Sequence, residues 1–192
     1  MKKIIALLLY CFIALLLIYL LLPLPAEPPP LPGSLKSTEP GDTVEIPGLF
    51  AYYTDLSRSQ VLDFYQKNFS RSSFLGIPLL TYRLNHPPEY ARETIRRTLQ
   101  STYYEEIVHP LRESLYVNGY EWENDPFTKP ESREKNKPMI GGKEFRSKVT
   151  VITRHSNPIV RLLVVGGFLL FALWLIKEAK EIYGSFRRYF KL

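Results

Sequence analysis

The sequence predicts a small α+β domain carried by two transmembrane helices. Two apolar stretches, at residues 4–22 and 159–176, are long enough to cross a membrane. The chain between them shows hydrophobic patterns of strand and helix period. We expect residues 48–156 to form one extracytoplasmic domain, with a sheet of about four strands and two helices on one face.

The first apolar stretch predicts an N-terminal transmembrane helix over residues 1–22. It holds nineteen residues without a charge. At about 1.5 Å per residue, a helix of that length covers about 28 Å, close to the ~30 Å apolar core of a bilayer. Two lysines precede the stretch and no basic residue follows it before Lys36, which places the N-terminus in the cytoplasm.

A cleaved signal peptide is the alternative interpretation of the same stretch. The apolar core of such peptides is usually about 7 to 15 residues, which is shorter than this one. A cleavage site after Ala26 would also have Leu24 where a small residue is expected. We therefore expect an uncleaved signal anchor.

The second apolar stretch predicts a transmembrane helix over residues 157–176, followed by a basic amphipathic tail over residues 177–192. Basic residues in the tail put the C-terminus in the cytoplasm as well, so that residues 23–157 lie outside. Apolar residues continue at helical spacing through the tail, and we expect it to bind anionic lipid at the inner leaflet. A cytoplasmic partner helix is the alternative ligand for this stripe.

The formal net charge of +6 lies entirely at the two membrane flanks. Residues 27–157 carry equal numbers of basic and acidic side chains, and a neutral domain has no electrostatic footprint for DNA or RNA. The single cysteine, Cys11, falls inside the first apolar stretch. The exported domain therefore has no disulfide and depends on its own core.

A proline-rich segment over residues 23–47 is expected to act as a stalk and linker. Residues 23–32 contain six prolines, which favour an extended polyproline II path. At about 3.1 Å per residue they would hold the domain about 30 Å from the bilayer. The same composition also fits a ligand for aromatic-groove modules.

Within the domain, apolar alternation predicts strands and apolar residues at helical spacing predict helices. Ser57 and Gln60 have capping-box spacing ahead of the first helix. Asn85, followed by His86 and two prolines, predicts the start of the second. Residues 124–143 are rich in Pro, Lys, Glu and Gly and predict a flexible exposed loop. The expected strands are residues 49–54, 79–84, 114–122 and 145–153, and the expected helices are residues 58–68 and 88–109.

No motif with catalytic or cofactor chemistry occurs in the chain, since H-E-x-x-H, G-x-S-x-G, P-loop and G-x-G-x-x-G patterns are all absent. Glu106 and His109 have the spacing of a helical metal pair, but di-metal bundles need two such motifs. A histidine in the last turn of a helix is also favoured by the helix dipole alone. We assign no catalytic, cofactor-binding or metal residue and expect no cofactor. If the domain is an enzyme, the candidates are His86, Glu106 and His109.

The segment from Leu84 to Tyr120, and YYEEIVHPLRESLYVNGYEW at residues 103–122, resemble segments of uncharacterised exported or membrane-anchored bacterial proteins. The resemblance covers the middle domain alone. It implies a bacterial envelope as the setting and brings no site residues.

We expect a two-span protein of the cytoplasmic membrane that presents its domain and the 124–143 loop to a protein partner. The role would be interaction or assembly without catalysis, and the thirteen tyrosines and eleven phenylalanines favour such contacts. Two alternatives stay open. One is an envelope enzyme acting on cell-wall or lipid material, and the other is an accessory subunit of a membrane complex in which the helices make the contacts.

Overall fold

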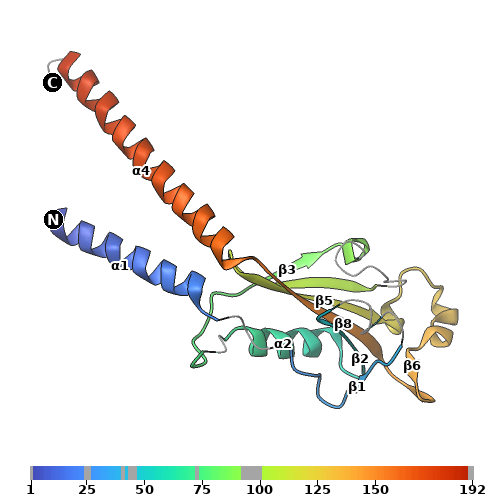
Figure 1. The fold of residues 1–192 in the computed structure, drawn as a ribbon. Helices are drawn as coiled ribbons and strands as arrows, with labels where there is room; N and C mark the ends of the chain where they lie inside the picture. Colours follow the sequence, from blue (N-terminus) through green and yellow to red (C-terminus); the bar gives the residue numbers. More distant parts are fainter. Residues whose placement is uncertain are drawn as a thin grey trace. The chain divides into compact units, whose positions relative to one another are not determined.

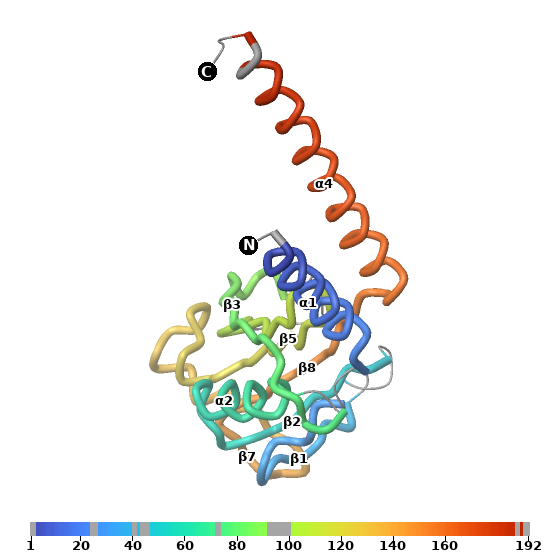
Figure 2. The backbone as a smooth tube through the Cα atoms, turned by 90° about the vertical axis from the view of Figure 1, so that its left-hand side faces the viewer, coloured from blue at the N-terminus to red at the C-terminus, as the bar shows by residue number. Residues whose placement is uncertain are grey.

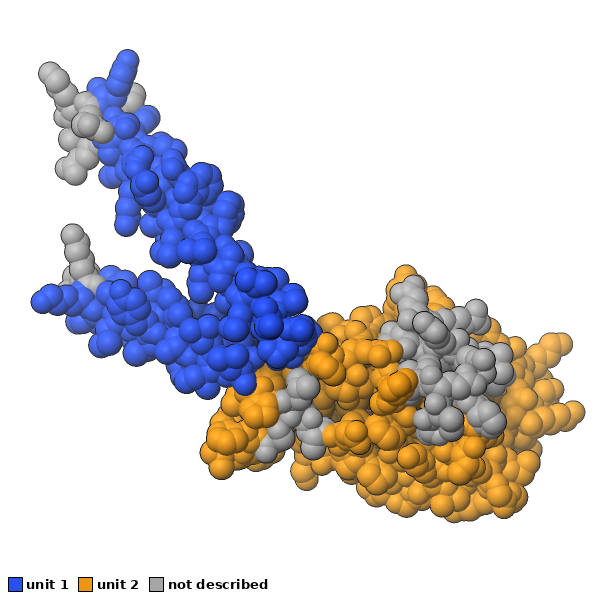
Figure 3. Space-filling model, in the orientation of Figure 1, with its two compact units in different colours: residues 1–21, 156–192 blue, residues 22–155 orange. Residues whose placement is uncertain are grey.

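The protein is described here by a computed structural model in which the chain forms two compact units (Figure 3). One unit comprises residues 1–21 and 156–192, and the other comprises residues 22–155. The second unit is the α+β domain, and the first contains two long apolar helices. The structure describes residues 2–23, 27–39, 42, 47–71, 74–91 and 101–189.

The domain is built on one antiparallel sheet of six strands in the order β1, β2, β8, β5, β4, β3 (Figure 1). The α+β class is thereby confirmed, and the sheet is larger than the four strands expected. A separate two-stranded ribbon pairs β6 with β7. The strands are β1 (Leu35–Lys36), β2 (Leu49–Thr54), β3 (Tyr82–His86), β4 (Tyr103–His109), β5 (Glu113–Glu121), β6 (Met139–Ile140), β7 (Lys143–Glu144) and β8 (Ser147–His155).

The strand expected at residues 49–54 is confirmed as β2, and the other three expected strands lie within three residues of β3, β5 and β8. The helix expected over residues 88–109 is wrong at its described ends, although Ala91 between them is α-helical. Pro88–Tyr90 form a short 3-10 turn, η1, and Tyr103–His109 form β4, while residues 92–100 lie outside the described residues.

Strand β4 replaces the expected helix because it gains a ladder partner on both sides, β3 and β5. Tyr103 and Ile107 are four residues apart, and that spacing shares a face in a strand as well as in a helix. The local pattern therefore does not distinguish the two structures, and pairing with neighbouring strands decides between them.

Helix α2 (Arg58–Phe69) packs on one face of the sheet (Figure 2). The Ser57 side chain accepts from the Gln60 backbone, and the Gln60 side chain accepts from the Ser57 backbone, so the predicted capping box is confirmed. The apolar face of α2 meets the sheet in the core of the domain. This core contains Tyr52, Val61, Leu62, Tyr65, Phe69, Tyr103, Ile107, Leu115, Val117, Val149 and Val151.

The described parts of the proline-rich segment, residues 23, 27–39, 42 and 47, belong to the domain, where a spacer over residues 23–47 was expected. Leu31 is buried in the main core, and β1 pairs with β2. The carbonyl of Pro23 accepts a hydrogen bond from Arg112 Nη2 at 3.0 Å. Burial of a leucine side chain and pairing of backbone groups favour a segment that packs over one that extends into solvent.

The long strands β5 and β8 define two ends of the sheet. At the end that we call the proximal end, Glu113 pairs with His155, and at the distal end Glu121 pairs with Ser147. These pairs lie eight residues apart along β5, or about 27 Å at a strand rise of about 3.4 Å. Pro23 is held at the proximal end by Arg112, the neighbour of Glu113. Both connections to the apolar helices therefore leave the domain from its proximal end.

The first unit contains two helices long and apolar enough to cross a membrane, α1 (Lys2–Leu21) and α4 (Pro158–Tyr189). The 32 residues of α4 extend about 48 Å, more than the ~30 Å apolar core of a bilayer. This helix continues without a break past residue 176, the expected boundary between span and tail. In this unit, the buried Arg161 donates from Nη1 to the Leu20 carbonyl at 3.3 Å. That carbonyl belongs to the last turn of α1, where no intrahelical donor is available.

Candidate interaction surface

The distal segment, residues 122–144, connects β5 to the region just before β8 at the distal end of the sheet. The sequence predicts a flexible loop over residues 124–143, but the segment has regular local structure. It contains the 3-10 turns η2 (Trp122–Asn124) and η3 (Pro130–Asn136) and the β6–β7 ribbon. The exposed loop expected here therefore contains short regular elements.

A buried aspartate organises the first part of the distal segment. The Asp125 side chain is 0% exposed. Its Oδ1 accepts a hydrogen bond from the Phe127 backbone N–H at 2.9 Å, and its Oδ2 accepts one from Thr128 Oγ1 at 2.6 Å. A carboxylate that accepts from the backbone two residues later fixes a turn, and Pro126 between them restricts the backbone further.

The charge on Asp125 is retained in this buried position. Burial by itself would raise the pKa of the carboxyl group, but hydrogen bonds from Thr128 and from the Phe127 backbone hold the pKa of Asp125 below its usual range. The Tyr120 hydroxyl also lies 3.5 Å from Oδ2. The turn is therefore held by an ionised acceptor, which makes stronger hydrogen bonds than a neutral one.

A second set of contacts ties η3 to this turn. Arg133 donates from Nη1 to the Glu123 carbonyl at 2.7 Å and from Nε to the Thr128 carbonyl at 3.2 Å. Asn136 Nδ2 donates to Thr128 Oγ1 at 2.9 Å. Further along, the Lys137 ammonium lies 4.8 Å from the centroid of the Trp122 ring. The two halves of the distal segment are thus joined to each other.

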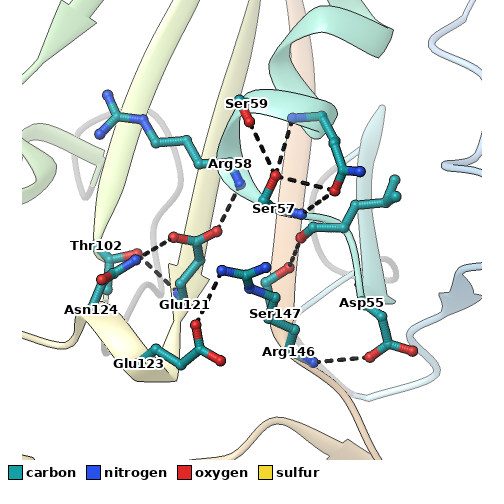
Figure 4. A network of polar contacts seen from close by, with 12 residues as sticks. Asp55, Ser57, Arg58, Ser59, Thr102, Glu121, Glu123, Asn124, Arg146 and Ser147 are labelled. Carbon is teal, nitrogen blue, oxygen red and sulfur yellow. Dashed lines mark hydrogen bonds and ion pairs between the residues drawn. The ribbon is translucent and has the colours of Figure 1, made fainter.

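The distal segment is also joined to the sheet and to α2, as Figure 4 shows. Glu121, the last residue of β5, accepts from the Arg58 backbone N–H at 2.7 Å and from Asn124 Nδ2 at 2.7 Å. Arg146 Nη2 contacts Glu123 Oε2 at 3.1 Å. The Glu121 carboxylate therefore holds the start of α2 and the start of the distal segment together.

The turn fixed by Asp125 places a large apolar side chain in solvent. The Phe127 side chain is 80% exposed, although its backbone N–H is tied to the buried carboxylate. Met139, on β6, is exposed as well. Because the backbone that carries this exposed ring is already fixed, binding costs little backbone entropy, so the ring is suited to anchor a partner.

The histidines singled out from the sequence lie in two separate places. His86 Nε2 is 2.8 Å from Glu106 Oε2, on β3 and β4, and both side chains are partly exposed. Burial and the neighbouring Glu106 carboxylate raise the pKa of Tyr116, on β5, to about 12. Tyr116 therefore stays protonated at neutral pH and is not an activated nucleophile beside the His86–Glu106 pair.

His109 lies at the proximal end and faces the α2 side of the sheet, whereas Glu106 faces the other side. His109 Nδ1 is 2.7 Å from Glu113 Oε1, and the His109 ring stacks on Phe69 with the ring centroids 4.3 Å apart. Arg112 Nε also donates to Glu113, at 3.1 Å. Because Glu106 and His109 lie on a strand and face opposite sides, the structure does not bring them together as a metal pair.

In this cluster, hydrogen bonds oppose the effect of burial on the pKa of Glu113. Burial would raise the pKa of the carboxyl group, but the contacts with His109 and Arg112 hold the pKa of Glu113 below its usual range. Among the described residues, His109 Nε2 is buried without a hydrogen-bond partner. No group of three or more His, Cys, Asp or Glu side chains in the described ranges could hold a metal ion.

Comparisons with models of known protein families, with curated proteins and with solved structures find no match to this chain. The interpretation of the surface therefore depends on its geometry.

Sequence reasoning missed the role of Asp125, although a local signal was present. An aspartate followed by proline and then, three residues from the aspartate, by threonine is typical of a side-chain-stabilised turn. The signal does not reveal that the carboxylate is buried, because its burial depends on the packing of β5 and η3 around it.

Proposed function

We propose that this chain is a two-span membrane protein that presents its α+β domain to a protein partner, in an interaction or assembly role without catalysis. The observation that carries the proposal is Phe127, an exposed ring on a turn held by a buried, ionised aspartate. The ring lies at the distal end of the domain, away from the end to which the apolar helices connect. A partner outside the membrane could reach it there.

The membrane arrangement is part of the same proposal. The two apolar helices and the basic residues at their flanks support an uncleaved signal anchor, cytoplasmic termini and an extracytoplasmic position for residues 23–157. The setting is the cytoplasmic membrane of a bacterial envelope. The basic C-terminal tail, residues 177–192, would meet anionic lipid or a cytoplasmic helix where α4 extends beyond the bilayer core.

The His86–Glu106 pair favours one alternative function. An envelope enzyme acting on cell-wall or lipid material needs at least two titratable side chains within hydrogen-bond reach, and this pair meets that condition at 2.8 Å. Glu106→Gln would abolish such an activity. It would leave partner binding at the distal end unchanged, which separates the two functions.

In-cell crosslinking of the full-length protein tests the proposal. A photoreactive residue placed at Phe127 is expected to capture one discrete protein, and the same residue at Tyr82, exposed on the edge strand β3, is the matched control. Phe127→Ser should weaken binding of that purified protein by about 2 kcal/mol, or about 30-fold in Kd.

Three outcomes would contradict this proposal. Equal capture at Phe127 and Tyr82, or an affinity unchanged by Phe127→Ser, would remove the contact from the distal segment. If substitutions in α1 and α4 abolish the complex while substitutions on the domain surface do not, the protein is an accessory subunit whose helices make the contacts.

A further inference from the structure

The proximal end of the domain carries two leucines in a backbone conformation that leucine rarely adopts. Leu75, between α2 and β3, has φ +55°, and Leu111, in the β4–β5 turn, has φ +64°. Their side chains are 82% and 54% exposed. A left-handed conformation costs a branched residue energy, and here that cost is not offset by burial in the core of the domain.

Three further apolar side chains are exposed in the loop that contains Leu75, namely Phe74, Ile77 and Leu80. This loop begins where α2 ends, and there Phe69 stacks on His109 at the start of the β4–β5 turn. The Leu79 backbone N–H also bonds to the Ser70 carbonyl at 2.9 Å, which closes the loop. The loop and the β4–β5 turn therefore lie at the same end of the sheet.

The chain connections lead from this end to the apolar helices. His155 pairs with Glu113, and α4 begins at Pro158. Three residue steps separate His155 from Pro158, and they span at most about 11 Å. Leu22 alone lies between α1 and Pro23, which Arg112 holds. If these helices cross a bilayer, the proximal end cannot be far from its surface.

We propose that the proximal apolar surface, formed by Phe74, Leu75, Ile77, Leu80 and Leu111, inserts into the headgroup region of the bilayer that α1 and α4 cross. The inference rests on the proposed membrane anchoring. It replaces the expected 30 Å stalk with a domain seated on the membrane, because Pro23 and Leu31 of the proline-rich segment both contact the domain.

Chemistry favours lipid as the occupant of this surface. The apolar side chains are exposed in two neighbouring connections, and binding to a membrane interface strengthens with the apolar area that it buries. Two exposed basic residues, Arg71 and Arg154, lie at the same end and can meet lipid phosphates. The buried Glu113, held by His109 and Arg112, stabilises the β4–β5 turn from within, so that this turn presents Leu111 outward.

Depth-dependent fluorescence quenching on the full chain tests the inference. Cys11 is replaced by serine, and single cysteines carrying an environment-sensitive fluorophore are placed at Leu75, Leu80, Lys135 or Leu163. The protein is reconstituted into nanodiscs of phosphatidylcholine and phosphatidylglycerol, with or without spin-labelled lipid. Lys135, exposed in the distal segment, is the control for a water-exposed probe, and Leu163 in α4 is the control for membrane insertion.

Probes at Leu75 and Leu80 are expected to shift their emission to shorter wavelength and to be quenched by lipid labelled near the headgroup. The probe at Lys135 should show neither effect. If the probes at Leu75 and Leu80 behave like the one at Lys135 while Leu163 is quenched, the domain is not seated on the membrane and the inference fails. If Leu163 also escapes quenching, the proposed membrane anchoring itself fails.

Discussion

Removal of the Asp125 carboxylate should destabilise the distal segment, and the size of the effect follows from its contacts. Asp125→Ala deletes the acceptor for two hydrogen bonds, from the Phe127 N–H and from Thr128 Oγ1. Hydrogen bonds to a charged group contribute about 1.5 to 3 kcal/mol each. We therefore expect a loss of about 3 kcal/mol or more in the free energy of unfolding.

Asparagine at the same position separates the hydrogen bond from the charge. Asp125→Asn keeps an oxygen that can accept from the Phe127 N–H but has no negative charge, so its cost should be nearer 1 kcal/mol. The exposed Glu131, an acidic residue of the same segment, is the matched control. Glu131→Ala should change the stability by less than about 0.5 kcal/mol.

Urea unfolding of the full chain in mild detergent measures these differences. The chain has two tryptophans, and replacing Trp174 by phenylalanine leaves Trp122 in the distal segment as the reporter. Hydrogen exchange at the Phe127 amide reports on the turn itself and should accelerate in Asp125→Ala. An alanine variant with wild-type stability and unchanged exchange would refute the role of the carboxylate in holding the turn.

The pH dependence supplies a second check on Asp125. Because the pKa of Asp125 is held below its usual value in the folded protein, the carboxylate stabilises the fold above the unfolded-state pKa of about 3.9 and loses this effect as the pH falls. The difference between wild type and Asp125→Ala should therefore shrink below about pH 4.

Two further predictions concern the sheet. Gly119→Ala should cost about 2 to 3 kcal/mol, because the added Cβ would lie 2.0 Å from Cζ of the buried Tyr103 ring. Tyr103→Ala in the same chain should recover part of that cost in a double-mutant cycle, and strictly additive effects would contradict the clash. Glu113→Gln should lower the free energy of unfolding at neutral pH. It should also reduce the further loss of stability on acidification, because the ionised Glu113, with its depressed pKa, stabilises the fold only above about pH 4.5. A variant with the wild-type acid profile in unfolding experiments would count against this contribution.

Elements defined by local chemistry were predicted closely. The capping box at Ser57 and the apolar positions of α2 lie within one stretch of chain, so the helix over residues 58–68 was identified with an end error of one residue. Strand β2 was predicted at its observed residues for the same reason, since its aromatic and apolar composition favours a strand in any sheet.

Elements that depend on distant partners were predicted poorly. The sequence predicted residues 103–109 as the end of a helix. Their pairing with β3 and β5 does not show in the spacing of their apolar residues. The sequence predicted a stalk for the proline-rich segment, because nothing near Leu31 indicates that the Leu31 side chain packs in the core. The sequence predicted a loop for the distal segment and did not reveal the burial of Asp125, because that burial is decided by the packing around it.

The sequence by itself determined the two apolar helices, the helix α2 and the absence of a disulfide in the domain, because hydrophobicity, capping and residue type act over a few neighbouring positions. Only the tertiary structure decided which residues meet at each end of the sheet. β2 pairs with β8 across most of the domain sequence, and this pairing, with that of β8 and β5, creates the proximal and distal ends. The exposed leucines lie at the proximal end and Phe127 lies at the distal end. Long-range strand pairing, unlike local propensity, decides at which end of the sheet each turn lies.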